Sequence, residues 1–395
     1  MRKTTIRLAV TAALYLAIAG CGGGGGGDGS VVPAPPQLWT YTAPLVNGDG
    51  WEVSTLAAEG MDEARITRMM EHVHDGTYPG IDSIAIARNN RLVLVEQIRT
   101  TTGEFDDWIN NHDPNRHVLH STSKSFTSAL IGIAIDQGHI PSTQVGFYSL
   151  FNYATYQNWD PRKDQMTLED ALTMRLGIEW DEWSLPYTDP NNDLVFLENN
   201  NRDWSKALLD LPVTSDPGTA FAYNTAATIA IGQALENATG IPMADFANQH
   251  LFYPMDITTA AWGMTPTGLP NGGSGLFLLT RDMLKFGQLF IDDGVWQGQA
   301  LISPEWIADS VTRHVDLTSW GTSTRGYGLQ WWLADFVYGT QVLEAYVTSG
   351  YGGQYIYCVP DLDLVVAFTG HNYANGAGVE NLYTMMRNSI IPSIN

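Results

Sequence analysis

The chain has 395 residues, and 44% of them are hydrophobic, which is enough to bury a substantial core in one large domain or in two interleaved domains. The formal net charge is -22 at pH 7. A charge this negative argues against nucleic acid or an anionic lipid surface as a binding partner.

The N-terminus has the layout of an export signal. Basic residues precede an apolar run over 8–19, which is too short for a comfortable transmembrane span. The end of this run, Ile18-Ala19-Gly20-Cys21, resembles a bacterial lipobox, in which the cysteine thiol is acylated and becomes the new N-terminus. The alternative is an ordinary signal peptide with an incidental cysteine. In a Gram-negative cell, the lack of Asp after the cysteine implies the outer membrane.

A low-complexity segment follows. Unbroken glycine over 22–27 and a proline-rich stretch over 31–36 predict a tether that is first flexible and then stiff. We therefore expect three parts, which are a lipoprotein signal over 1–20, a tether over 21–50 and a globular domain over 51–395. The domain would be exported, with a lipid at Cys21 as its only link to the membrane, and would face the periplasm or the cell surface. The other cysteine, Cys358, is predicted to be a buried strand residue rather than a reactive thiol.

The globular part begins with a helix and a hairpin. Apolar residues at helical spacing predict an amphipathic helix over 62–76. Strands over 81–87 and 92–97 then flank Asn89-Asn90, a pair that tolerates the positive φ of a tight hairpin turn. A helix followed by a hairpin suggests helices packed on an antiparallel sheet.

Ser121 and Lys124 stand at the mouth of the next helix, which is apolar and runs to Gly138. A serine in the first turn and a lysine three residues later share one face, so the hydroxyl and the amine can meet. Free backbone N–H groups at this helix end also favour developing negative charge. The lysine can take the serine proton only if desolvation or nearby cations lower its pKa. Because Ser-x-x-Lys is a common pattern, the motif alone favours the plainer interpretation, a capped helix with a solvated lysine.

The rest of the chain separates into a helical part and a part with strands. Helices are predicted from 167 to about 177, over 225–240 and over 246–252, and strand signals are scarce between about 145 and 260. After them come helices over 281–290, 304–313 and 383–390 and strands over 328–333, 355–359 and 364–368. The predicted fold class is α+β, an antiparallel sheet flanked by helices with an inserted, mainly helical lobe over 145–260.

Three motifs now occur in the order and rough spacing of the serine β-lactamase and penicillin-binding fold. They are Ser121-Thr122-Ser123-Lys124, Tyr223-Asn224-Thr225 and Tyr351-Gly352-Gly353-Gln354. The sequence most resembles the class C-related branch, with its family VIII carboxylesterases and 6-aminohexanoate-dimer hydrolases, over roughly residues 60–390. The resemblance implies that Ser121 is the nucleophile and Lys124 its base. It also implies that Tyr223 shares their proton and later protonates the leaving group.

The second and third motifs depart from the commoner family pattern. The family's commoner motif is Tyr-x-Asn, with asparagine in the third position. Here the asparagine, Asn224, is in the second position and Thr225 is in the third, so either side chain could donate a hydrogen bond to Lys124 or to the substrate carbonyl. Tyr351 stands where β-lactamases and DD-peptidases carry the lysine that meets a substrate carboxylate, and without that cation carboxylate recognition weakens.

By the same resemblance, the two glycines of the third motif would let substrate approach the strand. Gly353 is one of them. The backbone N–H groups of Gln354 and Ser121 would then form the oxyanion hole. In the lobe, Trp180, Trp183 and Tyr187 either line an aromatic mouth of the cleft or pack in the core or at the surface.

Other catalytic schemes lack their sequence anchors. The sequence contains neither Gly-x-Ser-x-Gly nor His-Glu-x-x-His, and no metal or cofactor is predicted. We therefore expect a cofactor-free, lipid-tethered serine hydrolase that cleaves small ester or amide substrates through an acyl-enzyme. The alternatives are a β-lactamase or DD-peptidase, and a non-catalytic binding module that keeps the fold. The oligomeric state stays open.

Overall fold

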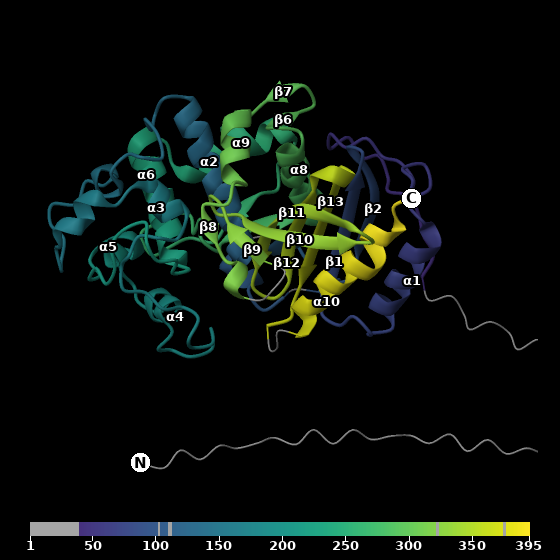
Figure 1. Cartoon of the computed structure of the whole chain (residues 1–395), viewed down its shortest axis with the longest axis horizontal. Coiled ribbons are helices and arrows are strands. Elements are labelled where there is room, and N and C mark those ends of the chain that lie inside the picture. The colour runs from purple at the N-terminus through teal and green to yellow at the C-terminus, as the bar shows by residue number, and fades with distance from the viewer. Residues whose placement is uncertain (1–38, 102, 110–112, 321–323, 374–376) are drawn as a thin grey trace, which may run out of the picture. The chain divides into compact units, whose positions relative to one another are not determined.

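The computed structural model describes residues 39–101, 103–109, 113–320, 324–373 and 377–395 (Figure 1). The predicted signal peptide, Cys21 and the tether as far as residue 38 lie outside the described residues. The last part of the predicted tether, 39–50, packs on the domain. Trp39 is 8% exposed, and the Tyr41 hydroxyl donates to the Val93 carbonyl at 2.8 Å. Aromatic side chains in this stretch bury apolar area, so the domain begins earlier than the sequence predicts.

An eight-stranded antiparallel sheet forms the centre of the domain, in the order β2-β1-β13-β12-β11-β10-β9-β8. Its strands are β1 (Ile81–Arg88), β2 (Arg91–Gln97), β8 (Val315–Asp316), β9 (Thr324–Tyr327), β10 (Trp332–Tyr338), β11 (Gln341–Gly350), β12 (Gln354–Val359) and β13 (Leu364–Gly370). A three-stranded sheet has the order β3 (Arg116–Val118), β5 (Leu276–Leu279) and β4 (Ala261–Trp262). A two-stranded sheet pairs β6 (Val295–Trp296) with β7 (Gln299–Ala300). The hairpin prediction is confirmed, because Asn89 and Asn90 have φ of 52° and 56°.

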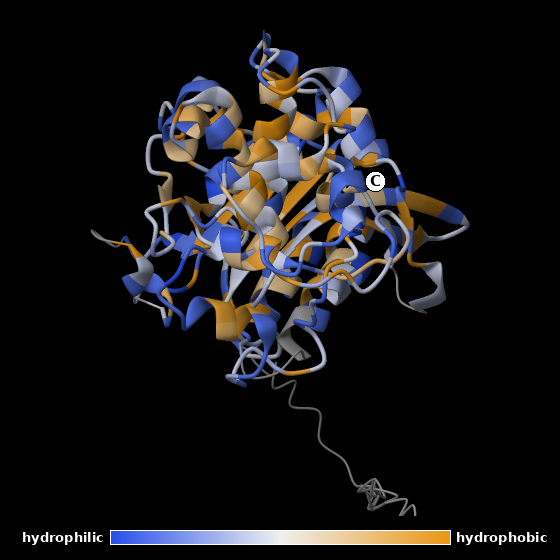
Figure 2. Ribbon diagram, turned by 90° about the vertical axis from the view of Figure 1, so that its left-hand side faces the viewer, coloured by the Kyte–Doolittle hydropathy of each residue, from blue (hydrophilic) through white to orange (hydrophobic). Residues whose placement is uncertain are grey.

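Helices cover both faces of this sheet (Figure 1). On one face lie α1 (Glu63–His74) and α10 (Ala377–Met385), and on the other α2 (Ser123–Asp136), α8 (Thr280–Ile291) and α9 (Pro304–Ser310). Alternate residues of β1 serve the two cores: Ile84 and Ile86 pack toward α1, whereas Ala85 and Ala87 belong to the larger core that contains α2 and α8. Figure 2 shows hydrophobic residues along the inner strands and hydrophilic residues on many outer turns.

The lobe beside the sheet is helical, as predicted. It contains α3 (Leu168–Leu172), α4 (Asp193–Glu198), α5 (Trp204–Leu209), α6 (Thr225–Thr239) and α7 (Met243–Ala247). Thr167 and Asp170 form a capping box at the start of α3, and Gly240 ends α6 in the left-handed conformation, with φ of 70°. Among the described residues, no helix combines the length and the hydrophobicity that a membrane span requires.

Two elements near the C-terminus differ from prediction. The strand expected over 328–333 is wrong, because the chain leaves the sheet between β9 and β10. Gln330 has φ of 67° there, and its side chain donates to the Leu172 carbonyl at 2.7 Å and accepts from Thr228 at 2.8 Å. This buried polar junction joins sheet to lobe. The last helix begins at Ala377, earlier than predicted, and its regular part ends at Met385, after which Met386–Ile390 forms a π turn.

Candidate active site

Ser121 lies in a short 3-10 turn, His120–Thr122, which joins β3 to α2. The turn begins with a left-handed residue, since His120 has φ of 45°, a conformation that is costly for a residue with a side chain. Four aromatic rings surround the imidazole edge-on, those of Phe105, Trp108, Tyr351 and Tyr373. Burial and the nearby Lys124 ammonium lower the pKa of His120 to about 3, so the ring is neutral.

Lys124, the second residue of α2, is 1% exposed. Its Nζ donates to Ser121 Oγ at 2.9 Å, to Thr225 Oγ1 at 2.9 Å and to the Gly273 carbonyl at 2.8 Å. Burial lowers the pKa of Lys124 to about 8, against the opposing effect of the carboxylates of Glu182 and Glu198. A buried amine with a pKa near neutrality is in free-base form often enough to accept a proton from a serine.

Tyr223 completes a group of three catalytic candidates. It lines the same cavity as Ser121, and Lys124 Nζ lies 4.9 Å from its ring centroid. The rings of Trp183 and Trp332 stack on Tyr223, at centroid distances of 4.8 Å and 5.7 Å. Burial, and then the charge of Glu182, raise the pKa of Tyr223 well above its usual value. The phenol therefore keeps its proton and is suited to donate or relay it.

The structure separates the roles of Asn224 and Thr225, between which the sequence leaves a choice. Asn224 is the N-cap of α6, and its side chain accepts from the Ala227 N–H at 2.8 Å. Thr225 is the residue that meets Lys124. Glu182 was missed by the sequence analysis, although it accepts hydrogen bonds from both the backbone N–H and the hydroxyl of Thr225, at 2.7 Å and 2.8 Å. An acidic residue between two tryptophans in the apolar lobe was the signal that could have found it.

Two cavities meet at Ser121. One has a volume of about 370 Å³ and the other about 400 Å³, and both are lined by Ser121, Tyr187, Tyr351 and Tyr373. The first is lined in addition by Glu104, Phe105, Trp108, His120, Thr188, Leu194, Val195, Glu198 and Ser274. The second is lined in addition by Trp183, Pro186, Tyr223, Trp332, Ser349, Gly350, Gly352, Tyr355 and Asn372. Many of the lining side chains are aromatic, and among the described residues that line the two cavities there is no lysine or arginine.

Glu198 is one of two acidic residues that line the first cavity. Burial and the nearby carboxylate of Glu182 raise the pKa of Glu198 to about 7. Trp180, predicted as a possible lining residue, lies behind this wall. Its indole N–H donates to Glu182 at 2.8 Å, and it packs on the main core instead of lining the cleft. The aromatic mouth is formed by Trp183 and Tyr187 instead.

The glycine-rich third motif forms the turn between β11 and β12. Tyr351 faces both cavities, and its hydroxyl donates to the Tyr373 carbonyl at 2.7 Å. Gln354, in contrast, lines neither cavity, since its carboxamide is buried and bonds Gly370. Gly352 has φ of 82°, and a Cβ there would lie 2.2 Å from the Tyr373 ring, so this glycine makes room for a cleft wall and not for substrate alone. Gly353 follows with φ of 112°.

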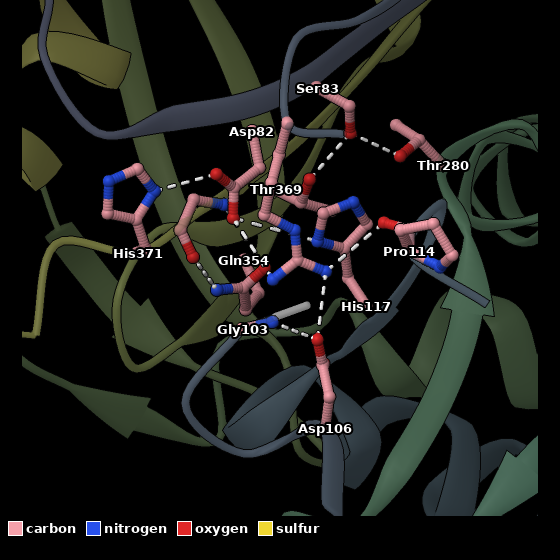
Figure 3. Close-up of polar contacts among 12 residues, drawn as sticks. Asp82, Ser83, Gly103, Asp106, Pro114, His117, Thr280, Gln354, Thr369 and His371 are labelled. Atoms are coloured by element: carbon pink, nitrogen blue, oxygen red, sulfur yellow. Dashed lines mark hydrogen bonds and ion pairs between the residues drawn. The ribbon is translucent and has the colours of Figure 1, made fainter. Parts of the chain in front are cut away.

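A buried ionic network ties the segments behind this wall together (Figure 3). Asp82, on β1, contacts the Nδ1 atom of His371 at 2.6 Å, and its other oxygen lies 3.7 Å from both Arg99 and His117. Arg99 in turn reaches Asp106 at 3.5 Å. These partners come from the loop that carries Phe105, from β3 before the serine turn and from the segment that carries Tyr373. Burial raises the pKa of Asp82, partly offset by His371.

Comparison with known proteins agrees with this geometry. The Beta-lactamase family matches residues 62–383. The chain belongs to the β-lactamase family. A 6-aminohexanoate-dimer hydrolase of Paenarthrobacter ureafaciens is 24% identical over 275 residues, which are 64% of this chain and 65% of that relative. The match therefore spans slightly less than two thirds of the relative's length.

Solved structures of the β-lactamase family share the fold. A penicillin-binding protein from Bacillus halodurans has a TM-score of 0.60 and 15% identity, covering 81% of this chain and 99% of that one. A β-lactamase/D-alanine carboxypeptidase from Yersinia pestis has a TM-score of 0.59 and 17% identity, covering 84% and 99%. The predicted resemblance and fold class are thus confirmed, and the family and the curated relative together support a serine hydrolase.

Proposed function

We propose that the chain is a serine hydrolase that cleaves small ester or amide substrates through an acyl-enzyme on Ser121. The observation that carries this proposal is the contact between Lys124 Nζ and Ser121 Oγ at 2.9 Å, in a buried site where the pKa of the lysine is lowered to about 8. The name of the 24% identical relative adds support for cleavage of an amide bond, and not for that relative's substrate, since an aminohexanoate dimer carries a carboxylate.

The proposed acylation step uses all three catalytic candidates. The Ser121 Oγ–H proton passes to Lys124 as Oγ bonds to the substrate carbonyl carbon, and the carbonyl π electrons move to its oxygen. The resulting oxyanion collapses, the bond to the leaving group breaks, and Tyr223 donates the proton that the leaving group needs and regains one from Lys124. Water then attacks the acyl-enzyme by the same proton route, which releases the acid and restores Ser121.

The oxyanion would rest on two backbone N–H groups. Ser121 supplies one of them in this proposal. For the second we favour Tyr351 over the Gln354 expected from sequence, because Tyr351 lines both cavities with the nucleophile and Gln354 lines neither.

Substrate charge follows from the walls of the cleft. Glu104 and Glu198 line it, and within the part of the chain that the structure describes no lysine or arginine lines it. A carboxylate on the substrate would have no cation to pair with, so we propose neutral or positively charged substrates. The same absence of a pairing cation disfavours the alternative of a β-lactamase or DD-peptidase, whose substrates carry a carboxylate.

The test is a panel of p-nitrophenyl esters, anilides and nitrocefin, read against Ser121→Ala. We expect ester hydrolysis to exceed nitrocefin turnover, and Ser121→Ala to lose both hydrolysis and fluorophosphonate labelling. Full activity in Ser121→Ala would contradict the nucleophile assignment. Fast nitrocefin turnover would favour the β-lactamase alternative, and an inert but folded wild-type protein would favour a non-catalytic module.

A further inference from the structure

Glu182 lies behind the catalytic lysine and is 2% exposed. Four hydrogen bonds converge on its carboxylate. One oxygen accepts from the Trp180 indole at 2.8 Å and from the Thr225 backbone N–H at 2.7 Å. The other accepts from the Thr225 hydroxyl at 2.8 Å and from the Tyr187 hydroxyl at 3.1 Å. Within the part of the chain that the structure describes, no lysine or arginine forms an ion pair with this carboxylate.

The direction of these bonds restricts Thr225. A carboxylate can only accept hydrogen bonds, so the single hydroxyl hydrogen of Thr225 is committed to Glu182. Toward Lys124 the Thr225 oxygen is therefore an acceptor. The other fixed neighbour of Lys124 Nζ, the Gly273 carbonyl at 2.8 Å, is also an acceptor only.

A neutral amine has two N–H bonds and one lone pair. In this site both N–H bonds of free-base Lys124 are required by Thr225 and Gly273. Among the described residues, the one further hydrogen-bond partner of Nζ is Ser121 Oγ at 2.9 Å. The lone pair must then point at the serine hydroxyl. After the Ser121 proton moves to this lone pair, the ammonium has three N–H donors for the same three oxygens, so no partner has to move.

We infer that Glu182 is a positioning residue, which acts through the Thr225 hydroxyl to aim the lone pair of Lys124 at Ser121. This inference rests on the proposed function. It assigns Glu182 no contact with substrate. Loss of the carboxylate would let Thr225 rotate its hydroxyl toward Lys124 and occupy the lone pair, since the carboxamide of Glu182→Gln can donate where the carboxylate could only accept.

The charge of Glu182 has a second, opposite effect. Its carboxylate opposes the desolvation that lowers the pKa of Lys124, so Glu182→Gln lowers that pKa further. The other titratable groups that face Lys124 are Tyr223, His120 and Glu198. A residue that only supported the fold would give the reverse result, because a loosened site admits water and moves a lysine pKa upward, toward its ordinary value.

The experiment measures kcat/KM against pH with a p-nitrophenyl ester for the wild type, Glu182→Gln, Thr225→Val and the double variant. We expect Glu182→Gln and Thr225→Val each to lower the value at which kcat/KM levels off at high pH, here called the plateau, by about 10²-fold. The midpoint of the rise in kcat/KM at low pH, which follows the pKa of Lys124, should move to lower pH in Glu182→Gln. The double variant should be no slower than Thr225→Val, because both changes act through one hydroxyl. Thr225→Ser, which keeps the hydroxyl, should restore the plateau to within a few-fold.

Glu236→Gln is the matched control, since Glu236 also lies on the lobe and accepts a backbone N–H, from Met243 at 2.8 Å, away from the cleft. It should leave the profile unchanged. Thermal unfolding of every variant identifies those that fail to fold. The inference is overturned if Glu182→Gln keeps the wild-type plateau, if its midpoint rises, or if the two plateau losses multiply in the double variant. Activity that survives Ser121→Ala would instead overturn the proposed function, so the two failures are distinguishable.

Discussion

At the scale of single residues, the site depends on which protonation state each buried group can hold. Tyr223 and His120 are both neutral near pH 7, because burial raises the pKa of the phenol and lowers the pKa of the imidazole. Lys124 is the group in contact with Ser121 whose pKa, about 8, lies close to physiological pH. The nucleophile's activation should therefore follow the titration of this one amine.

The first prediction concerns the pH dependence of acylation. Only the free-base form of Lys124 can accept the serine proton, so kcat/KM for a neutral ester should rise roughly tenfold per pH unit at low pH and level off above a midpoint of about 8. Steady-state or stopped-flow profiles between about pH 5 and about pH 10 would measure it. Glu198 has a pKa of about 7 and is the competing group. An acid limb that vanishes in Glu198→Gln would assign the titration to Glu198 instead.

How much of the site can be predicted from the sequence depends on how far apart along the chain the contacting residues are. Ser121 and Lys124 are three residues apart, so helical geometry alone brings them together. Glu182 and Thr225 meet only because the lobe folds a loop against the start of α6, and no local pattern records that contact. Asn224 and Thr225 illustrate the same limit, since adjacent positions at a helix start face different neighbours and sequence could not choose between them.

At the scale of elements, regular patterns were predictable and exceptions to them were not. The periodicity of α1 and the Asn-Asn turn after β1 follow from local rules. The break at Gln330 does not, because a buried hydrogen-bonded junction with the lobe overrides the apolar run around it. The turn from β11 to β12 is a similar case. Its glycines are visible in sequence, but the ring that requires one of them comes from beyond β13.

The second prediction tests that turn. In Gly352→Ala the new Cβ would lie 2.2 Å from the Tyr373 ring, so the ring must move, and with it a wall that both cavities share. We expect a raised KM and a lower kcat/KM for aromatic esters, together with about 1 kcal/mol lost from the free energy of unfolding because φ is 82°. Ester kinetics and urea denaturation measure the two effects.

Gly298→Ala is the control that separates the steric clash with Tyr373 from the free-energy cost of placing a residue with a Cβ at positive φ. Gly298 has φ of 81°, nearly the same as Gly352, but no atom within 4 Å of the position of an added Cβ. Its variant should lose similar stability and keep the wild-type KM. Equal changes in KM for both variants would show that general loosening, rather than the Tyr373 wall, determines substrate binding.

At the scale of the whole molecule, net charge bears on how the domain would meet a membrane. The chain carries a formal net charge of -22, so an anionic lipid surface should repel the domain. Electrostatic attraction would therefore not hold the domain at such a surface, whereas a covalent lipid could. This makes the proposed lipid anchor at Cys21 testable by the kind of treatment that releases the protein.

The third prediction is that the chain, produced in a Gram-negative host, fractionates with membranes through Cys21. High salt weakens electrostatic attachment by screening and leaves acyl chains inserted, so a salt wash should leave the wild type bound and detergent should release it. Cys21→Ser removes the thiol that would be acylated and should appear in the soluble fraction. Any hydrolysis of p-nitrophenyl esters by the wild type should be unchanged in this variant, because the described domain begins at residue 39. Immunoblots of salt-washed and detergent-extracted membranes measure the distribution. Retention of Cys21→Ser on the membrane would contradict the anchor. A wild type that is released by salt, or is soluble from the start, would also contradict it and would favour an ordinary signal peptide.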